Sequence, residues 1–128
     1  MAISDYLANN LLNQVLRNTT FPAITARWLS YHTGDPGKTG TGSPLASCPR
    51  VAVTFNAAAS GTSSSAALAT GVSAASAAAI THVAIWDGSA TATANHLFSG
   101  AMTSGGVRII AAGSTLVLAS GKLMVAFG

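Results

Sequence analysis

Few side chains in this sequence of 128 residues are of a kind that catalyses reactions. It has only three acids, Asp5, Asp35 and Asp87, and no Glu. In a Ser-His-Asp triad one of these acids would have to support a histidine such as His82 next to a reactive serine. The sequence contains no Gly-x-Ser-x-Gly segment, and both Asp35 and Asp87 stand beside glycine in turn-like segments, where Asp is a common residue. We therefore interpret these acids as turn residues and predict that the protein is not an enzyme.

Metal binding would need His32, His82 and His96 to converge, because three histidines can hold zinc. None of them has the helical pairing or the neighbouring carboxylate that supports such a site. We interpret each as a hydrogen-bonded residue of a β surface. Cys48 is the single cysteine, which excludes an internal disulfide and a cysteine-based zinc site. We expect it to pack as a small apolar group, and we expect no cofactor.

The composition is unusual in its low charge, since only 7% of the residues are charged and 49% are hydrophobic. A typical soluble domain has about 25% charged residues and keeps its neighbours apart with them. The formal net charge is +3, but the six bases are scattered, whereas nucleic-acid binding needs clustered phosphate contacts. Residues 51–86 lack charge, yet Ser, Thr and Gly interrupt them too often for a membrane span. We predict neither a nucleic-acid nor a membrane partner, and a surface that is covered by other subunits.

The N-terminal segment is predicted to be a helix over residues 4–17. Ser4 or Asp5 can cap its first N–H groups, and Pro22 keeps the helix from continuing. The large apolar side chains fall on one face, and they are Leu7, Leu11, Leu12, Val15 and Leu16. A helix of about four turns is marginal alone in water. This stripe must therefore dock on the protein's own β core or on a neighbouring subunit.

The rest of the chain shows alternating patterns and Gly-rich turns that indicate short strands. We predict strands at residues 23–32, 50–56, 80–87, 95–102, 107–111, 115–119 and 122–127, and a long loop at 33–49. Residues 57–79 are nearly all Ala, Ser, Thr and Gly and are read as a loop followed by a weak strand at 68–72. The predicted fold is mainly β, an antiparallel β-sandwich or barrel preceded by an N-terminal α-helix. It forms a single domain over 1–128, with the helix at about 4–17 and the β domain at about 23–127.

Four segments carry a resemblance to a known family. They are residues 4–12 (Ser-Asp-Tyr-Leu-Ala-Asn-Asn-Leu-Leu) followed by Arg17-Asn18-Thr19, residues 29–37, residues 52–55 (Ala-Val-Thr-Phe) and residues 81–87 (Thr-His-Val-Ala-Ile-Trp-Asp). In this order they resemble a widespread set of small structural proteins of tailed bacteriophages, labelled head decoration, minor capsid or tail-fibre-like. The chain departs from that pattern at Cys48-Pro49, where relatives tend to have Gly-x-Tyr.

The resemblance implies a virion structural protein that is made in the cytoplasm of the host bacterium. We expect a capsid decoration (cement) protein that binds and stabilises the assembled head, with the major capsid protein and copies of itself as partners. The alternative is a minor tail or tail-fibre-like adaptor or tip subunit whose partners are other tail proteins. A third alternative is a carbohydrate-binding β-sandwich, although the sequence offers few carboxylates for it.

The candidate assembly contacts come from the helix face and from charged residues in and around the long loop. Arg27 and Arg50 are candidates for pairing with acidic residues of the capsid shell. The full set is Leu7, Leu11, Val15, Arg27, Asp35, Lys38 and Arg50.

Overall fold

The computed structural model describes residues 2–45, 48–67, 69–73, 78–102, 108–110, 115–118 and 120–126. Within these residues a short strand precedes a helix, and strands follow to the C-terminus. In chain order they are β1 (Ala2–Ile3), α1 (Asp5–Arg17), β2 (Arg27–His32), β3 (Val51–Val53), β4 (Thr62–Ser64), β5 (Ala69–Ser73), β6 (Ala78–Ile80), β7 (His82–Trp86), β8 (His96–Ala101), β9 (Arg108–Ile110), β10 (Thr115–Leu118) and β11 (Met124–Ala126).

The main sheet has five antiparallel strands in the order β1-β8-β7-β2-β3. Its central strand β7 is buried from Val83 to Trp86, so both of its faces are covered. The register places Leu29 opposite Ile85 and Ile85 opposite Phe98, which puts these three side chains on one face, the groove face. Trp86 and its neighbours in register lie on the other face, which we call the loop face.

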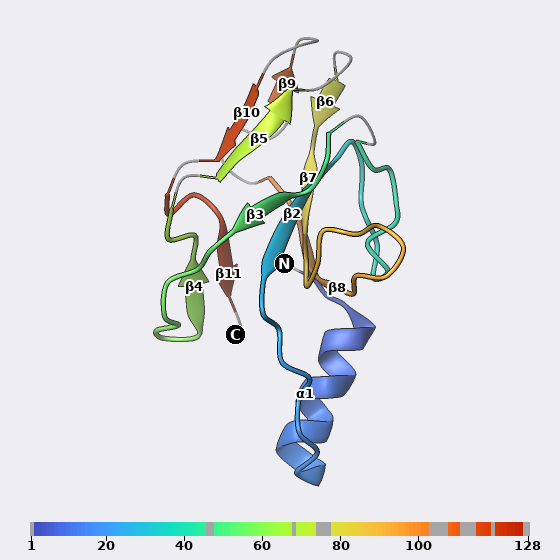
Figure 1. Cartoon of the computed structure of the whole chain (residues 1–128), viewed down its shortest axis with the longest axis vertical. Coiled ribbons are helices and arrows are strands. Elements are labelled where there is room, and N and C mark those ends of the chain that lie inside the picture. Colours follow the sequence, from blue (N-terminus) through green and yellow to red (C-terminus); the bar gives the residue numbers. More distant parts are fainter. Residues whose placement is uncertain are drawn as a thin grey trace.

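Three further antiparallel pairs, β4–β11, β5–β10 and β6–β9, complete the described fold. The pairs β5–β10 and β6–β9 lie at the end of the molecule opposite α1, and β4–β11 lies beside the main sheet (Figure 1). The predicted fold class, a mainly antiparallel β fold of sandwich type with an N-terminal helix, is confirmed.

The hydrophobic core lies between the groove face, the start of α1 and the segments around Leu45 and Leu123. Leu29 is fully buried at its centre, and Leu7 of the helix is 5% exposed. Cys48 is part of this cluster, as predicted, and burial raises the pKa of its thiol. The buried members are Leu7, Leu29, Tyr31, Leu45, Cys48, Val53, Ile80, Val83, Ile85, Leu97 and Leu123.

Three predicted strands have clearly different bounds in the structure, and the one predicted at residues 50–56 covers only β3, Val51–Val53. The strand predicted at residues 23–32 begins only at Arg27, because its partner β3 reaches no further than the pair Arg27 and Val53. The strand predicted at 80–87 is divided at Thr81, since β6 pairs with β9 whereas β7 pairs with β2 and β8. Alternation in the sequence reports which face a side chain takes, and it contains no information about a change of partner strand.

The Ala-rich region also differs from the prediction. Strand β4, which pairs with β11, was not predicted, because Thr62, Ser63 and Ser64 lack apolar alternation. Strand β5 lies close to the weak strand predicted at residues 68–72, while residues 68 and 74–77 are outside the described part of the chain. The last three predicted strands contain β9, β10 and β11, and residues 107, 111, 119 and 127 at their ends are outside it as well.

Candidate functional site

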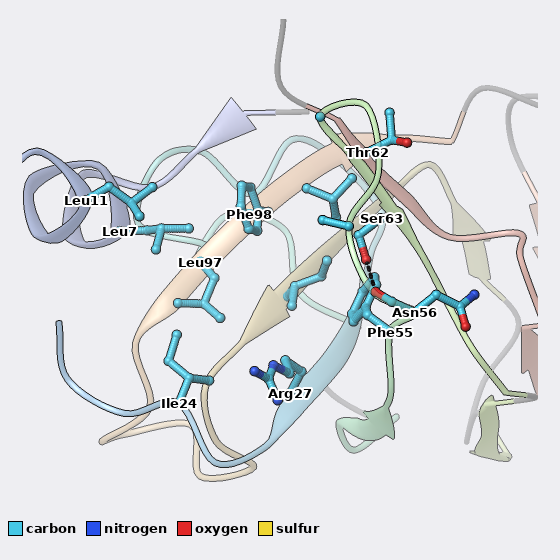
Figure 2. Close-up of a pocket in the computed structure, with 14 residues that line it drawn as sticks. Leu7, Leu11, Ile24, Arg27, Phe55, Asn56, Thr62, Ser63, Leu97 and Phe98 are labelled. Carbon is cyan, nitrogen blue, oxygen red and sulfur yellow. Dashed lines mark hydrogen bonds between the residues drawn. The ribbon is translucent and has the colours of Figure 1, made fainter. Parts of the chain in front are cut away.

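An apolar groove of about 490 Å³ lies between α1, the groove face of the sheet and the β4–β11 pair. Figure 2 shows Leu7 and Leu11 of the helix on one side of it and Phe55 on the other. The consecutive residues Leu97 and Phe98 both line the groove, although neighbours on a regular strand point to opposite faces. The register of β7 and β8 shifts between Ile85 and Trp86, and this bulge turns both side chains the same way.

The helix α1 lies against the groove with its first turns only. Ser4 caps it, since its Oγ accepts a hydrogen bond from the Leu7 N–H at 3.1 Å. In the second half of the helix the apolar side chains face solvent: Leu12 is 57% exposed, Val15 76% and Leu16 74%. The predicted stripe is therefore divided into a docked part and an exposed part.

The loop face is covered by residues 33–45, which follow β2 and which we call the covering segment. Two histidines hold this segment by hydrogen bonds. The Nδ1 of His32 lies 2.7 Å from the carbonyl oxygen of Gly42, and the Nδ1 of His96 lies 2.9 Å from that of Lys38. Because a carbonyl oxygen only accepts, each Nδ1 carries a hydrogen. Between these bonds Gly40, at φ +75°, lies so close to Trp86 that a Cβ there would be 2.7 Å from the indole ring.

A directional chain of hydrogen bonds runs beneath this segment. The Nε1–H of Trp86 donates to the Ser30 Oγ at 2.8 Å, and the Ser30 hydroxyl lies 2.8 Å from the Nε2 of His32. Since Nδ1 of His32 is the donor to Gly42, the neutral ring has an unprotonated Nε2 that can accept from the Ser30 hydroxyl. Burial lowers the pKa of His32, the hydrogen bond to Gly42 partly opposes this shift, and the nearby charges of His96, His82 and Arg50 add to it, so the net direction favours a neutral ring.

Arg50 is half-buried and its side chain bonds within the protein. Its Nη1 donates to the carbonyl oxygens of Gly88 and Ala90, both at 3.0 Å, and its guanidinium carbon lies 3.6 Å from the centroid of the Trp86 ring. Burial lowers the pKa of this guanidinium, and the charge of Asp87 partly opposes the shift. Arg50 therefore fixes the loop between β7 and β8 on the loop face.

The same loop is closed at its base by Asp87. One carboxylate oxygen accepts from the Asn95 backbone N–H at 2.6 Å and the other from the Asn95 side chain at 2.8 Å. Asp35 similarly accepts the Gly37 N–H at 2.9 Å. Both acids serve as turn residues, as the sequence predicted.

The predicted assembly contacts do not form one surface. Leu7, Leu11 and Arg27 line the groove, and Val15 is on the exposed half of α1. Lys38 forms an ion pair of 3.2 Å with Asp5 at the start of the helix, with both side chains exposed. Asp35 lies in the turn of the covering segment, and Arg50 is bonded internally. That any of these residues contacts a partner remains a prediction.

Two kinds of residue were missed by sequence reasoning. Leu12 and Leu16 were placed on the helical stripe but not among the contacts, because spacing does not show where the helix leaves the core. Ser30 was not singled out, although it stands two residues before His32 on the same strand face, and that spacing was a usable signal.

Within the part of the chain that the structure describes, no three His, Cys, Asp or Glu side chains are placed to hold a metal ion. His32 and His82 are opposite each other on β2 and β7, but His82 bonds through Nδ1 to the Thr81 hydroxyl at 2.8 Å. Among the same described residues no helix has the length and apolar content that crossing a membrane requires.

These features define a small, mainly antiparallel β protein whose buried polar groups hold its own loops and whose helix presents apolar side chains to solvent. The family described as Podophage GP4 fiber I protein gp80 matches residues 2–126, and the chain belongs to this family. It is thus a structural protein of the virion of a tailed phage, as the sequence resemblance implied. No curated protein that we searched matches the chain.

Proposed function

We propose that this chain is a non-enzymatic subunit of a tail fibre, acting at an adaptor or tip position. The observation that carries the proposal is the family match over residues 2–126, because the family's description names a fibre protein of a podophage. Other tail proteins and further copies of the chain are then its partners. The family's description favours this role over capsid decoration.

The geometry supports a role in assembly and not in catalysis. The side chains most suited to acid–base chemistry make hydrogen bonds inside the fold. His32 bonds to Ser30 and Gly42, and Asp87 bonds to Asn95. Trp86 has one ring face occupied by Arg50. Apolar surface, in contrast, is left open on α1, as a subunit that binds other subunits requires.

Capsid decoration remains the second candidate. The low charge content of 7% favours it, because a cement protein remains packed against the capsid subunits that it binds. In this case the major capsid protein would be the main partner, and multivalent contact would make a weak single site effective.

Locating the protein in the particle tests both candidates. Purified virions are separated into heads and tails, and each fraction is probed with antibody against the chain, with gold labelling of intact virions in parallel. We expect signal in the tail fraction and gold on the fibres. Signal in heads alone would replace the fibre proposal with decoration, and absence from virions would contradict both.

A further inference from the structure

A second cavity, of about 280 Å³, lies beside the covering segment and shares no lining residue with the apolar groove. It is bounded by β2, the covering segment, residues 48–50 and the loop between β7 and β8. We propose that this cavity binds a small carboxylate that carries hydroxyl groups, as a uronic acid sugar does, and that Arg50 holds the carboxylate. The proposal concerns this cavity alone and does not depend on the location of the protein in the virion.

Arg50 has hydrogen-bond donors that the fold does not use. A guanidinium has five N–H donors, and Nη1 gives its two to the carbonyl oxygens of Gly88 and Ala90. Among the residues that the structure describes, the hydrogen bonds of Arg50 use Nη1 alone. The remaining donors, on Nε and Nη2, form one edge of the guanidinium plane. A carboxylate binds such an edge with two parallel hydrogen bonds.

The charge of Arg50 is also uncompensated by direct contact. The ion pair found within the described part of the chain joins Lys38 and Asp5. Asp87 acts on Arg50 through its charge, but its two carboxylate oxygens accept from Asn95. Burial lowers the pKa of the guanidinium, because this cation is partly removed from water. A bound anion would compensate for that loss of hydration.

The other lining residues favour a sugar acid over a phosphate. Arg50 is the one ionised side chain among the described residues that line the cavity, so it can neutralise a carboxylate but not a phosphate dianion. The lining also has the hydroxyl groups of Thr41 and Thr91 and the apolar side chains of Pro44 and Leu45. A sugar ring presents both hydroxyl groups and C–H surface. Pockets for drug-sized ligands begin at roughly 300 Å³, so this cavity suits a smaller molecule such as one sugar ring.

Titration of the complete chain with D-glucuronate, followed by amide NMR shifts, tests the proposal. We expect saturable binding in the millimolar range, as is usual for so small a ligand, with shifts in residues 40–41 and 88–91. D-glucose has the same ring without the carboxylate and should bind at least about tenfold more weakly. Acetate has the carboxylate without the hydroxyl groups and should also bind at least about tenfold more weakly.

Substitutions at Thr91 test the site while Arg50 stays in place. Thr91 is exposed and lines the cavity, so Thr91→Asp puts a carboxylate of the chain near Arg50 and should weaken binding of D-glucuronate at least about tenfold. Thr91→Asn has the same size as this variant without the charge and should change the affinity less than about threefold. Thr93→Asp is the matched control, because Thr93 is exposed on the same loop but does not line the cavity. It should also change the affinity less than about threefold.

Arg50→Gln removes the cation itself and should abolish binding, with urea unfolding of the same protein as the check that it folds. If this variant does not fold, the Thr91 variants decide. Saturation that is never reached with D-glucuronate would overturn the proposal. Equal binding of D-glucose or of acetate, tighter binding of inorganic phosphate, or a Thr91→Asp protein that binds as the parent does would each overturn it as well.

Discussion

The hydroxyl of Ser4 donates a hydrogen bond to the backbone carbonyl of His96, 92 residues further along the chain. The same oxygen accepts the Leu7 N–H at the start of α1, and the Ser4 N–H donates to the Leu97 carbonyl at 2.9 Å. Ser4 is 1% exposed, so these bonds are shielded from water. One buried residue thus fixes both the start of the helix and its position on β8.

Replacing this residue tests the link. Ser4→Ala removes the cap and leaves the His96 carbonyl without this donor, so we expect the free energy of unfolding to fall by about 1–3 kcal/mol. Urea unfolding measures the loss. Thr39→Ala removes an exposed hydroxyl and is the control, expected within about 0.5 kcal/mol of the parent. Equal stability of the two variants would contradict the role assigned to Ser4.

A second prediction concerns Gly40, where the covering segment lies close to the Trp86 and His96 rings of the sheet. In Gly40→Ala the new Cβ would lie 2.7 Å from both the Trp86 and the His96 rings, at a φ of +75°. We expect a loss of about 2–4 kcal/mol from overpacking and backbone strain together. Gly37→Ala is the matched control, because its φ is +69° but nothing lies within 4 Å of the added atom. Thermal unfolding of both variants separates contact from strain, and a Gly37 variant that loses as much would disprove the packing explanation.

The buried neutral state of His32 predicts a dependence of stability on pH. Burial lowers its pKa from the ordinary value of 6.5, so the unfolded chain takes up a proton at a pH where the folded protein does not. Stability is therefore complete above about pH 6.5 and falls as the pH drops below that value. His32→Gln can keep one donor and one acceptor without titrating, and we expect a flatter profile.

Denaturant unfolding at a series of values from about pH 7 to about pH 5 measures this effect. His82 and His96 are retained in both proteins, so the difference between the profiles reports on His32. Parallel profiles would contradict the prediction.

Arg50 provides a prediction about local motion. Arg50→Lys keeps the charge but loses the planar guanidinium that stacks on Trp86 while its Nη1 donates to Gly88 and Ala90. We expect amide hydrogen exchange in residues 88–95 to rise about tenfold, equivalent to about 1.4 kcal/mol of lost local stability. Arg17→Lys, on the exposed helix end, is the control and should leave these amides unchanged. Unaltered exchange in the Arg50 variant would show that Arg50 does not hold the loop.

The fold could be predicted from the sequence to the extent that local patterns determine it. Alternation around Val51 and Val83 gave strands, and the spacing from Leu7 to Leu16 gave the helix, because each pattern reflects burial of one face. Strand β4 could not be found this way, because Thr62–Ser64 is half-buried and held by pairing with β11. The partner of a strand depends on residues far along the chain.

The candidate site was predicted only in part for a related reason. Helical spacing places Leu7 and Val15 on the same apolar stripe, but it does not show that the first is buried and the second is 76% exposed. Pairing of Arg50 with an acid of the capsid shell stays a prediction, and the sequence did not show that its Nη1 bonds to Gly88 and Ala90. Both distinctions depend on the tertiary arrangement of β7, β8 and the loop between them.

The main sheet ends on one side at β1, of two residues, and on the other at β3, of three. Unpaired backbone groups at a sheet edge are the usual starting point for uncontrolled strand addition, and a chain with few charges has little else to prevent it. Edges this short offer few positions where a foreign strand could bind. In the main sheet, therefore, a strand from another copy finds few backbone groups with which to pair.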